Sequence, residues 1–321
     1  MDRSSGARFD YVTVGHVTRD AIEHRTRGMS HQPGGSAFYS ALQASRLGLR
    51  TLILTQGVPS EIEALLAPYR DELELRVIPA ERTTTLSTRG SGENRTQRML
   101  AWAGPIVEAV ELDTDILHLA PVALETPAMR SGCASFVGIT PQGLVRHWEQ
   151  VEGVPLVQLD AASLLGDIPL IPPNSDVLVG DISSVELDPA LLPDSFDAAV
   201  ISEHECPSCH ALFSAARHCG APVAVTAGSR PTTVHLPTSE AASVVQCAPP
   251  PIVAARDDIG AGDAFAAAFF VALAESRAAL DAAMFGNAAA GVRIAGIGPD
   301  AIGDRAQIEM VLSAAESQRR P

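Results

Sequence analysis

The segment 255–273, ARDDIGAGDAFAAAFFVAL, places two glycines directly before an aspartate at the start of a long apolar run. Gly260 and Gly262 allow backbone conformations that other residues avoid, and they let a ligand approach the main chain. The run that follows is typical of a buried helix, whose first N–H groups and positive dipole end bind phosphate. The segment therefore predicts an anion site formed by Gly260, Ala261 and Gly262.

Asp263, the residue directly after this loop, has two interpretations. As an N-cap or first-turn acid, it would stabilise the helix by about 1 kcal/mol. As a general base, it would take a proton from a substrate hydroxyl, and the helix N-terminus would keep it ionised. The residues alone favour neither interpretation.

The absence of lysine excludes two kinds of chemistry, because all 23 basic residues of the chain are arginine. Without lysine there is no Schiff base, which excludes ordinary pyridoxal-phosphate catalysis. A P-loop of the GxxxxGK[ST] type is excluded as well. No dinucleotide glycine loop follows the first predicted strand, which argues against a dehydrogenase.

The bulk composition indicates a globular protein without a nucleic-acid or membrane partner. Hydrophobic residues make up 46% of the chain and aromatic residues 4%, and the formal net charge is −15. A general nucleic-acid binder needs a basic face, which this charge does not supply. No apolar run reaches the roughly 18 residues that span a bilayer, and the N-terminus has no signal-peptide pattern. We therefore expect a soluble, cytoplasmic protein.

Short apolar runs alternate with helix-like segments, which predicts an α/β fold with a doubly wound, mostly parallel sheet flanked by helices. Two helix-like segments end in Gly48 and Gly220, each a plausible C′ residue. We expect a single domain over residues 1–321. The predicted strands are 11–17, 51–57, 115–122, 155–161, 198–202 and 222–228.

Two polar segments, about 18–34 and 83–103, interrupt this alternation and are rich in Thr, Arg, Ser and Gly. They predict a small two-piece sheet that projects from the main body as a lid; the alternative is a pair of ordinary surface loops. The strands of such a lid have exposed edges, and pairing them between subunits would cover those edges. A homodimer through the lid is compatible with this pattern.

The CPSCH segment, from Cys206 to His210, has the spacing of a metal or haem attachment motif. Two further zinc ligands at regular spacing are not evident, and haem attachment needs export. We interpret the segment as the start of a helix, with Pro207 in its first turn and two small thiols.

Several motifs together resemble those of the ribokinase-like (PfkB) carbohydrate kinases. DDIGAGDAF resembles the DTxGAGD signature of that family, and VGHVTRD resembles its first strand with a substrate-binding aspartate. PGGSAFYSALQASRLG resembles the glycine-pair motif, ISEHE the NxxE motif, and VTAGSRPTTVHL the TxGxxG segment. Their order and spacing agree over almost the whole chain.

The resemblance implies a kinase that transfers the γ-phosphoryl group of ATP to a sugar hydroxyl, with Mg²⁺ as cofactor and a monovalent cation left open. Asp263 would be the catalytic base, and residues 260–262 would form the anion hole. Glu205 would bind the metal through water, in the family's manner. The substrate residues would be Asp20, Gly34 and Gly35, and the nucleotide residues Thr226, Gly228 and Asn287.

The chain departs from the family pattern at several positions. Ser202 replaces the asparagine of NxxE, Pro231 the second glycine of TxGxxG, and Asp258 the threonine of DTxGAGD. Tyr39 and Ser36 stand where the family has an asparagine and ribokinase has a lysine. The resemblance therefore leaves the loop and base intact, but it does not imply a furanose grip of the ribokinase type.

Within the family, GHVTRD, TTTLSTRG and TPQGLVR resemble most the myo-inositol kinase branch. Gln142 and Arg146 would supply amide and guanidinium contacts to a polyol, with Arg89 as a contact from the lid; a plain turn at TPQG is the alternative. A nucleoside kinase, with Phe38, Tyr39 and Trp102 forming a slot for the base, stays open. So does a non-catalytic sugar or nucleotide sensor, for which Asp263 would have no use.

Overall fold

The computed structural model describes residues 8–24, 28–89, 96–106, 112–126, 134–148, 180–237, 243–251 and 255–319. The predicted strand at 155–161 lies outside these residues. Within them, no helix combines the length and the apolar character needed to cross a bilayer.

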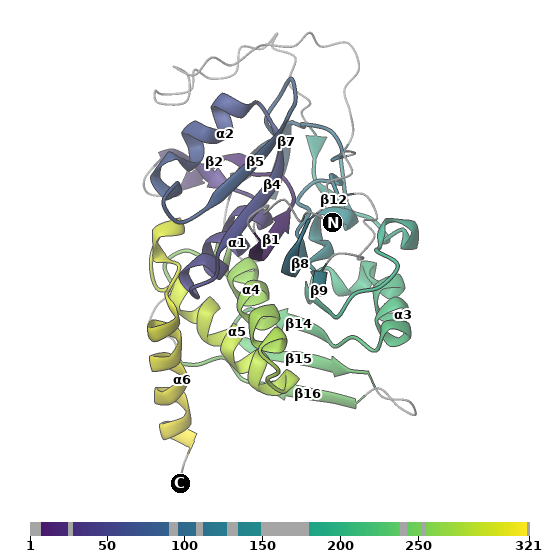
Figure 1. Cartoon of the computed structure of the whole chain (residues 1–321), viewed down its shortest axis with the longest axis vertical. Coiled ribbons are helices and arrows are strands. Elements are labelled where there is room, and N and C mark those ends of the chain that lie inside the picture. The colour runs from purple at the N-terminus through teal and green to yellow at the C-terminus, as the bar shows by residue number, and fades with distance from the viewer. Residues whose placement is uncertain are drawn as a thin grey trace, which may run out of the picture.

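Among the described residues, nine strands form the main sheet, in the order β16-β15-β14-β13-β9-β8-β1-β4-β5 (Figure 1). The strands from β14 to β5 in this order are all parallel, and β15 and β16 are antiparallel to their neighbours. This arrangement confirms the predicted mostly parallel sheet. The bounds are β1 Phe9–Val14, β4 Thr51–Gly57, β5 Glu74–Pro79, β8 Thr114–Leu119, β9 Ala134–Ile139, β13 Ala198–Ser202, β14 Val223–Ala227, β15 Arg230–Leu236 and β16 Ser243–Cys247.

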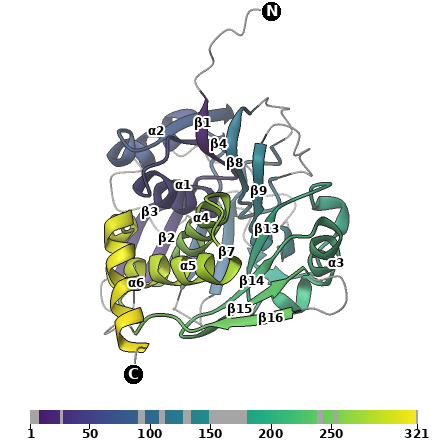
Figure 2. The same cartoon turned by 60° about the horizontal axis from the view of Figure 1, so that its bottom comes forward.

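Both faces of the sheet are covered, which explains why its central strands are nearly continuous apolar runs. In β1, Tyr11 lies in a cluster with α4 and α5, whereas Val12 and Val14 lie in a cluster with α3 on the other face. Figure 2 shows α4 and α5 side by side over the sheet and α3 apart from them. The helices are α1 Ser36–Arg46, α2 Pro59–Leu66, α3 His210–Cys219, α4 Ala261–Ala274, α5 Ala279–Ile294 and α6 Arg305–Arg319.

The predicted ends of two helices are confirmed. Gly48 follows α1 with a φ of 95°, and Gly220 caps α3 with a φ of 71°, both in the left-handed region that glycine favours. A 3₁₀ turn with Pro207 at its start leads into α3, so the CPSCH segment does begin a helix. The 3₁₀ turns are η1 Ala67–Tyr69, η3 Pro141–Val145, η5 Pro189–Leu191, η6 Cys206–Ser208 and η7 Pro299–Ala301.

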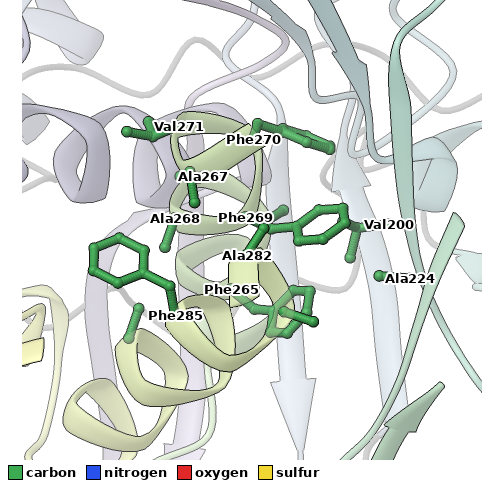
Figure 3. Packing of buried hydrophobic residues seen from close by; sticks show 14 of the residues in the cluster. Val200, Ala224, Phe265, Ala267, Ala268, Phe269, Phe270, Val271, Ala282 and Phe285 are labelled. Carbon is green, nitrogen blue, oxygen red and sulfur yellow. The ribbon is translucent and has the colours of Figure 1, made fainter. Parts of the chain in front are cut away.

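Helix α4 is buried over most of its length, because the sheet lies on one side of it and α1 and α5 on the others. Phe265 and Phe269 stack with their ring centroids 5.7 Å apart, and Figure 3 shows Phe269 extending towards Val200 of β13. A Cβ on Gly138 of β9 would stand 2.5 Å from the ring of Phe270. This close packing fixes the helix and, with it, the loop at its N-terminus.

The two polar segments form a second, five-stranded sheet in the order β11-β7-β6-β2-β3. The predicted small sheet is therefore confirmed, and the alternative of ordinary loops is wrong. The small sheet is mixed, because β2 and β6 run parallel whereas its other neighbouring strands run antiparallel. Leu86 and Met99 pack with Trp148 at its base. Its strands are β2 Thr18–His24, β3 Gly28–Gly34, β6 Thr85–Arg89, β7 Thr96–Ala101 and β11 Gly180–Asp181, and a separate pair consists of β10 Arg146–His147 and β12 Ser183–Ser184.

Candidate active site

The glycine loop lies at the N-terminus of α4, as the sequence predicts. Gly260 is the N-cap residue and has a φ of 77°. A Cβ at this position would stand 2.2 Å from Cδ1 of Tyr39, so both backbone conformation and packing require glycine. Around Gly262, by contrast, there is open space where a Cβ would be. The N–H of Ala261 donates to the carbonyl of Asp258 at 3.3 Å. The first amides of a helix have no acceptor within it, so this loop is suited to bind an anion.

Asp263 lies in the first turn of α4 and is partly buried. The Ser40 hydroxyl of α1 donates a hydrogen bond of 3.3 Å to the backbone carbonyl of Asp263, which ties the two helix starts together. The carboxylate charge reaches into the protein: burial raises the pKa of Tyr11 well above its ordinary value, and the charge of Asp263 raises it further. Asp263 is thus a carboxylate at the boundary between solvent and core.

Asp20 and Gly34, predicted as substrate residues, are in direct contact. They lie on the paired strands β2 and β3, and a Cβ on Gly34 would stand 2.2 Å from Oδ2 of Asp20. The hydroxyl of Thr18 donates to Oδ1 of Asp20 at 2.6 Å. Gly35 caps α1 with a φ of 92°, and a Cβ there would stand 2.2 Å from the carbonyl oxygen of His16. The glycine pair therefore makes room for the aspartate and for the turn into α1.

Glu125 organises the carboxyl ends of β1 and β8 from a buried position. Its Oε1 accepts from the backbone N–H groups of His16 at 2.8 Å and Val122 at 2.7 Å. Its Oε2 accepts from the N–H of Ala123 at 2.6 Å. These charge-assisted hydrogen bonds hold together the two chain segments that leave the sheet beside the site.

Arg146 is the residue at which the acidic side chains of the site converge. Burial lowers its pKa, and the charges of nearby carboxylates act against that lowering. Its Nη1 donates to the carbonyl of Val122 at 2.9 Å, and its Nη2 donates to Oε1 of Gln97 on β7 at 2.9 Å. Arg146 therefore joins the small sheet to the edge of the main sheet. The carboxylates that act on it are Glu205, Glu125, Asp263 and Asp20.

Glu205 follows β13 and is held by its own turn. The backbone N–H of Ser202 donates to Oε2 of Glu205 at 2.7 Å, and the N–H of Glu205 donates to the carbonyl of Ser202 at 3.1 Å. The replacement of the family's asparagine by Ser202 thus leaves the turn closed through backbone atoms. No group of three or more metal-ligating side chains occurs among the described residues.

The residues predicted for the nucleotide lie near β14, β15 and β16, away from β1 and β8. Thr226 is the second-last residue of β14 and pairs with Ser202 of β13, and Gly228 follows the strand with a φ of 61°. Asn287 of α5 is buried: its Oδ1 accepts from the Thr232 hydroxyl at 2.8 Å, and its Nδ2 donates to the carbonyl of Cys247 at 3.2 Å. The Asn287 side chain therefore connects α5 to β15 and β16 within the protein.

Gln142 and Arg89 take different places relative to this site. Gln142 is partly buried in the 3₁₀ turn after β9, on the same edge as Arg146. Arg89 is exposed at the end of β6, which pairs in register with β2. Because Leu86 is the partner of Asp20, Arg89 stands three residues, or about 10 Å, further along the strand.

Residues 195–302 match the family model of the pfkB carbohydrate kinases. This segment contains Glu205, Thr226 and the whole 260–263 loop. The chain carries a pfkB-family carbohydrate kinase domain. No curated protein matches the sequence of this chain.

Solved structures that share this fold cover nearly the whole length of the chain. Arabidopsis thaliana ribokinase, complexed with ribose and ATP, is 17% identical and has a TM-score of 0.65, with 95% of this chain and 99% of that chain covered. A Burkholderia thailandensis nucleoside kinase in complex with inosine is 15% identical, with a TM-score of 0.66 and coverages of 96% and 98%. A pyrophosphate-dependent myo-inositol-1 kinase converted into a myo-inositol-3 kinase is 17% identical, with a TM-score of 0.63 and coverages of 95% and 98%. The fold is therefore ribokinase-like, and with the family match it indicates a phosphotransferase.

Sequence reasoning missed Glu125 and gave Arg146 only a secondary place. Glu125 stands alone in the apolar segment APVALET, after a predicted strand. An isolated acid directly after a buried strand is a signal that could have singled it out, because buried carboxylates need several hydrogen-bond donors. The position of Arg146 among four carboxylates depends on segments far apart in the sequence, so no local pattern of the kinase indicates it.

Proposed function

We propose that this kinase transfers the γ-phosphoryl group of ATP to a hydroxyl of a cyclitol or sugar, with Asp263 as the general base. One observation carries the proposal: Asp263 directly follows the anion loop at the start of α4, and its charge acts on Arg146 together with that of Asp20. The proposed base, the proposed anion loop and the proposed contacts for an alcohol would then lie together at one edge of the sheet. Edges of this kind, beyond the carboxyl ends of parallel strands, hold ligands in α/β folds.

In this reaction each proton and bond has a defined place. The Asp263 carboxylate accepts the proton of the acceptor hydroxyl, and that oxygen forms a bond to the γ-phosphorus. The bond from phosphorus to the bridging oxygen breaks, and ADP leaves. The amides of Gly260, Ala261 and Gly262 stabilise the negative charge on the phosphoryl oxygens. Asp263 faces the acceptor rather than the phosphate, which limits the repulsion between the two anions.

The residues present fit a magnesium ion that is bound largely by phosphate oxygens and water. Mg²⁺ takes only one or two carboxylates in such sites, and Glu205 has one oxygen held by Ser202 N–H. Its Oε1 has no hydrogen-bond partner in the part of the chain that the structure describes. Glu205 would hold the ion through water, and the ion would neutralise charge on the donor phosphates.

For the acceptor, the arrangement supports a polyol. Asp20, held over Gly34 by Thr18, supplies a carboxylate that accepts hydrogen bonds from hydroxyls. Gln142 and Arg146 add an amide and a guanidinium. The small sheet formed by about 18–34 and 83–103 would serve as the lid, with Arg89 as its outermost contact and Gly35 as the hinge into α1. A homodimer that pairs the lid edges is part of the proposal.

A nucleoside acceptor has less support from the same residues. Phe38 and Tyr39 are 0% and 1% exposed, so neither offers an open aromatic face to a base. Trp102 contacts Trp148 with a centroid distance of 5.7 Å and donates its indole N–H to the carbonyl of Ala123 at 2.7 Å. The aromatic slot that a purine would need is therefore filled by the protein's own side chains.

Pyrophosphate is a second candidate donor, and one observation favours it. The Asn287 side chain, which would lie near the adenine, makes its hydrogen bonds to Thr232 and Cys247. With ATP as the donor, Thr226 and Gly228 would lie along the nucleotide, and Asn287 would support that site from beneath. With pyrophosphate, only the 260–262 loop and Glu205 would contact the donor. Pyrophosphate-dependent kinases are among the structures that share this fold.

The experiment that tests the proposal is a screen of two donors against several acceptors. ATP and pyrophosphate are each combined with myo-inositol, other inositols, hexoses, ribose and inosine in the presence of Mg²⁺, and the phosphorylated product is detected by mass spectrometry. We expect a phosphorylated cyclitol or sugar. Tight binding of ATP without any phosphorylated product would instead support a sensor, and phosphorylated inosine alone would support a nucleoside kinase.

A further inference from the structure

Arg293 of α5 places a fully buried positive charge behind the anion loop. Its side chain is 0% exposed, and its Nη2 donates to Oδ2 of Asp257 at 2.9 Å. Asp257 stands three residues before Gly260, at the start of the segment that forms the loop. Arginine is almost never fully buried unless it is paired, so this pair is a specific feature of the loop's support.

Asp257 is held as a carboxylate that shapes the segment on both sides. Its Oδ1 accepts from the N–H of Ile259 at 3.1 Å, and its Oδ2 accepts from the N–H of Gly298 at 2.9 Å. Burial raises the pKa of Asp257, but the hydrogen bonds from Arg293 and Gly298 lower it by a larger amount. The pKa of Asp257 therefore lies below its ordinary value. The carboxylate is therefore ionised at neutral pH, and its counter-ion is part of the chain.

The same guanidinium also contacts the second support of the loop. Its central carbon lies 5.7 Å from the ring centroid of Tyr39, and the Tyr39 ring is the surface against which Gly260 packs. Nη1 additionally donates to the backbone carbonyl of Asp257 at 3.5 Å. Arg293 thus touches both groups that determine where the loop lies.

Stability alone does not account for this buried pair. Two apolar residues of similar volume often stabilise a fold as well as a buried ion pair does. The Nε of Arg293 is buried and has no hydrogen-bond partner among the described residues, which adds a cost. A positive charge in a buried position near a loop of amide donors does, however, increase the attraction of that loop for an anion.

We propose that Arg293 is a positioning residue: a built-in cation that, through Asp257 and Tyr39, orders the 260–262 loop and strengthens its hold on the donor phosphate. The inference rests on the proposed function. It also answers a question that the sequence leaves open, because a carboxylate with an arginine as its counter-ion does not need a dissolved monovalent cation. Donor binding is thus independent of potassium.

The test measures donor binding rather than turnover, so it does not depend on the acceptor. ATP and pyrophosphate are each titrated calorimetrically with Mg²⁺ into the full-length chain, in potassium chloride and in tetramethylammonium chloride at equal ionic strength. The variants are Arg293→Met and Asp257→Asn/Arg293→Met, which carries no unpaired buried charge. Arg277→Met is the matched control, because Arg277 also lies over an aromatic ring, 4.6 Å from the centroid of Phe285, but away from the loop. Circular dichroism and thermal unfolding show which variants are folded.

We expect the wild type and Arg277→Met to bind the donor with affinities that differ less than about twofold between the two salts. Arg293→Met and the double variant should lose at least about tenfold. Millimolar guanidinium should restore part of the loss in Arg293→Met but none in the double variant, which has no carboxylate to receive it. A merely structural residue would not show this difference.

Three results would overturn the inference. The first is a wild type whose donor affinity falls tenfold without potassium, and the second is a folded double variant that binds the donor as tightly as the wild type. Both of these leave the proposed function intact. The third is a folded wild type that binds neither ATP nor pyrophosphate in any salt, and this result overturns the proposed function as well.

Discussion

Tyr39 lies so close to Gly260 that a Cβ on the glycine would stand 2.2 Å from Cδ1 of the ring. The tyrosine comes from α1 and the glycine from the cap of α4, so this contact joins the glycine-pair segment to the anion loop. Ser40 and the carbonyl of Asp263 form a second connection, one residue further along α1. The position of the proposed base thus depends on α1 as well as on its own helix.

Gly260→Ala should destabilise the fold more than Gly220→Ala, which also places an alanine at a positive φ. The left-handed backbone costs an alanine about 1–2 kcal/mol, and the overlap with Tyr39 adds about 1–3 kcal/mol. Gly220→Ala is the matched control, because Gly220 has a φ of 71° and nothing within 4 Å of a Cβ. Urea unfolding at neutral pH compares the two variants. Equal losses of stability would show that the Tyr39 contact does not matter.

Gly34→Ala should impair binding of the acceptor without unfolding the protein. The new methyl group would occupy the place of the Asp20 carboxylate, which is the end of a side chain and is able to move away. We expect the KM for the acceptor to rise at least about tenfold while the thermal unfolding temperature changes little. Because the effect acts through Asp20, Gly34→Ala should add little to Asp20→Ala. Fully additive effects of the two substitutions would contradict this explanation.

Arg146→Met should weaken acceptor binding more than a variant that loses only the contact of Arg146 with the small sheet. The variant removes a guanidinium on which Glu205, Glu125, Asp263 and Asp20 all act, so these carboxylates would repel one another. Gln97→Leu is the control, because it keeps the guanidinium and removes the hydrogen bond from Arg146 to Gln97, together with the one from Gln97 Nε2 to the Thr88 hydroxyl within the small sheet. Steady-state kinetics should show a larger increase in KM for Arg146→Met. A comparable increase in the two variants would limit the role of Arg146 to its hydrogen bond with the small sheet.

His118 should make the protein less stable in acid. Its Nδ1 lies 2.8 Å from the Tyr11 hydroxyl and its Nε2 lies 3.0 Å from the Thr140 hydroxyl, and burial lowers its pKa from 6.5 to about 3. Between these two values the unfolded chain binds the proton and the folded chain does not, so the free energy of unfolding falls as the pH falls. One such group contributes up to about 1.4 kcal/mol per pH unit.

His118→Gln should reduce this dependence on pH, because glutamine does not titrate. Urea unfolding at pH 7 and pH 5 measures the slope, which should be shallower in the variant although its stability at pH 7 is lower. An unchanged slope in His118→Gln would mean that another group takes up the proton.

Local patterns in the sequence were sufficient for the parts of the site that a single segment builds. Glycine chemistry predicts the loop at 260–262, and motif order singles out Asp20 and Gly34, whose contact with each other no local pattern predicts. The sequence does not predict the antiparallel strands β15 and β16, because RPTTVHL resembles part of a binding motif rather than a strand. Glu125 and Arg146 depend on contacts between segments of β1, β8 and β9, which no periodicity encodes.

The most direct test of the central claim is the turnover of Asp263→Asn, measured with the donor and acceptor that the screen identifies. Asparagine keeps the size and the first-turn position but does not accept a proton, so we expect a folded protein whose kcat falls about 10²–10⁴-fold. Asp258→Asn, which removes the same charge from the same loop, should retain most of its activity. Near wild-type turnover in Asp263→Asn, or an equal loss in both variants, would contradict the role of Asp263 as the base.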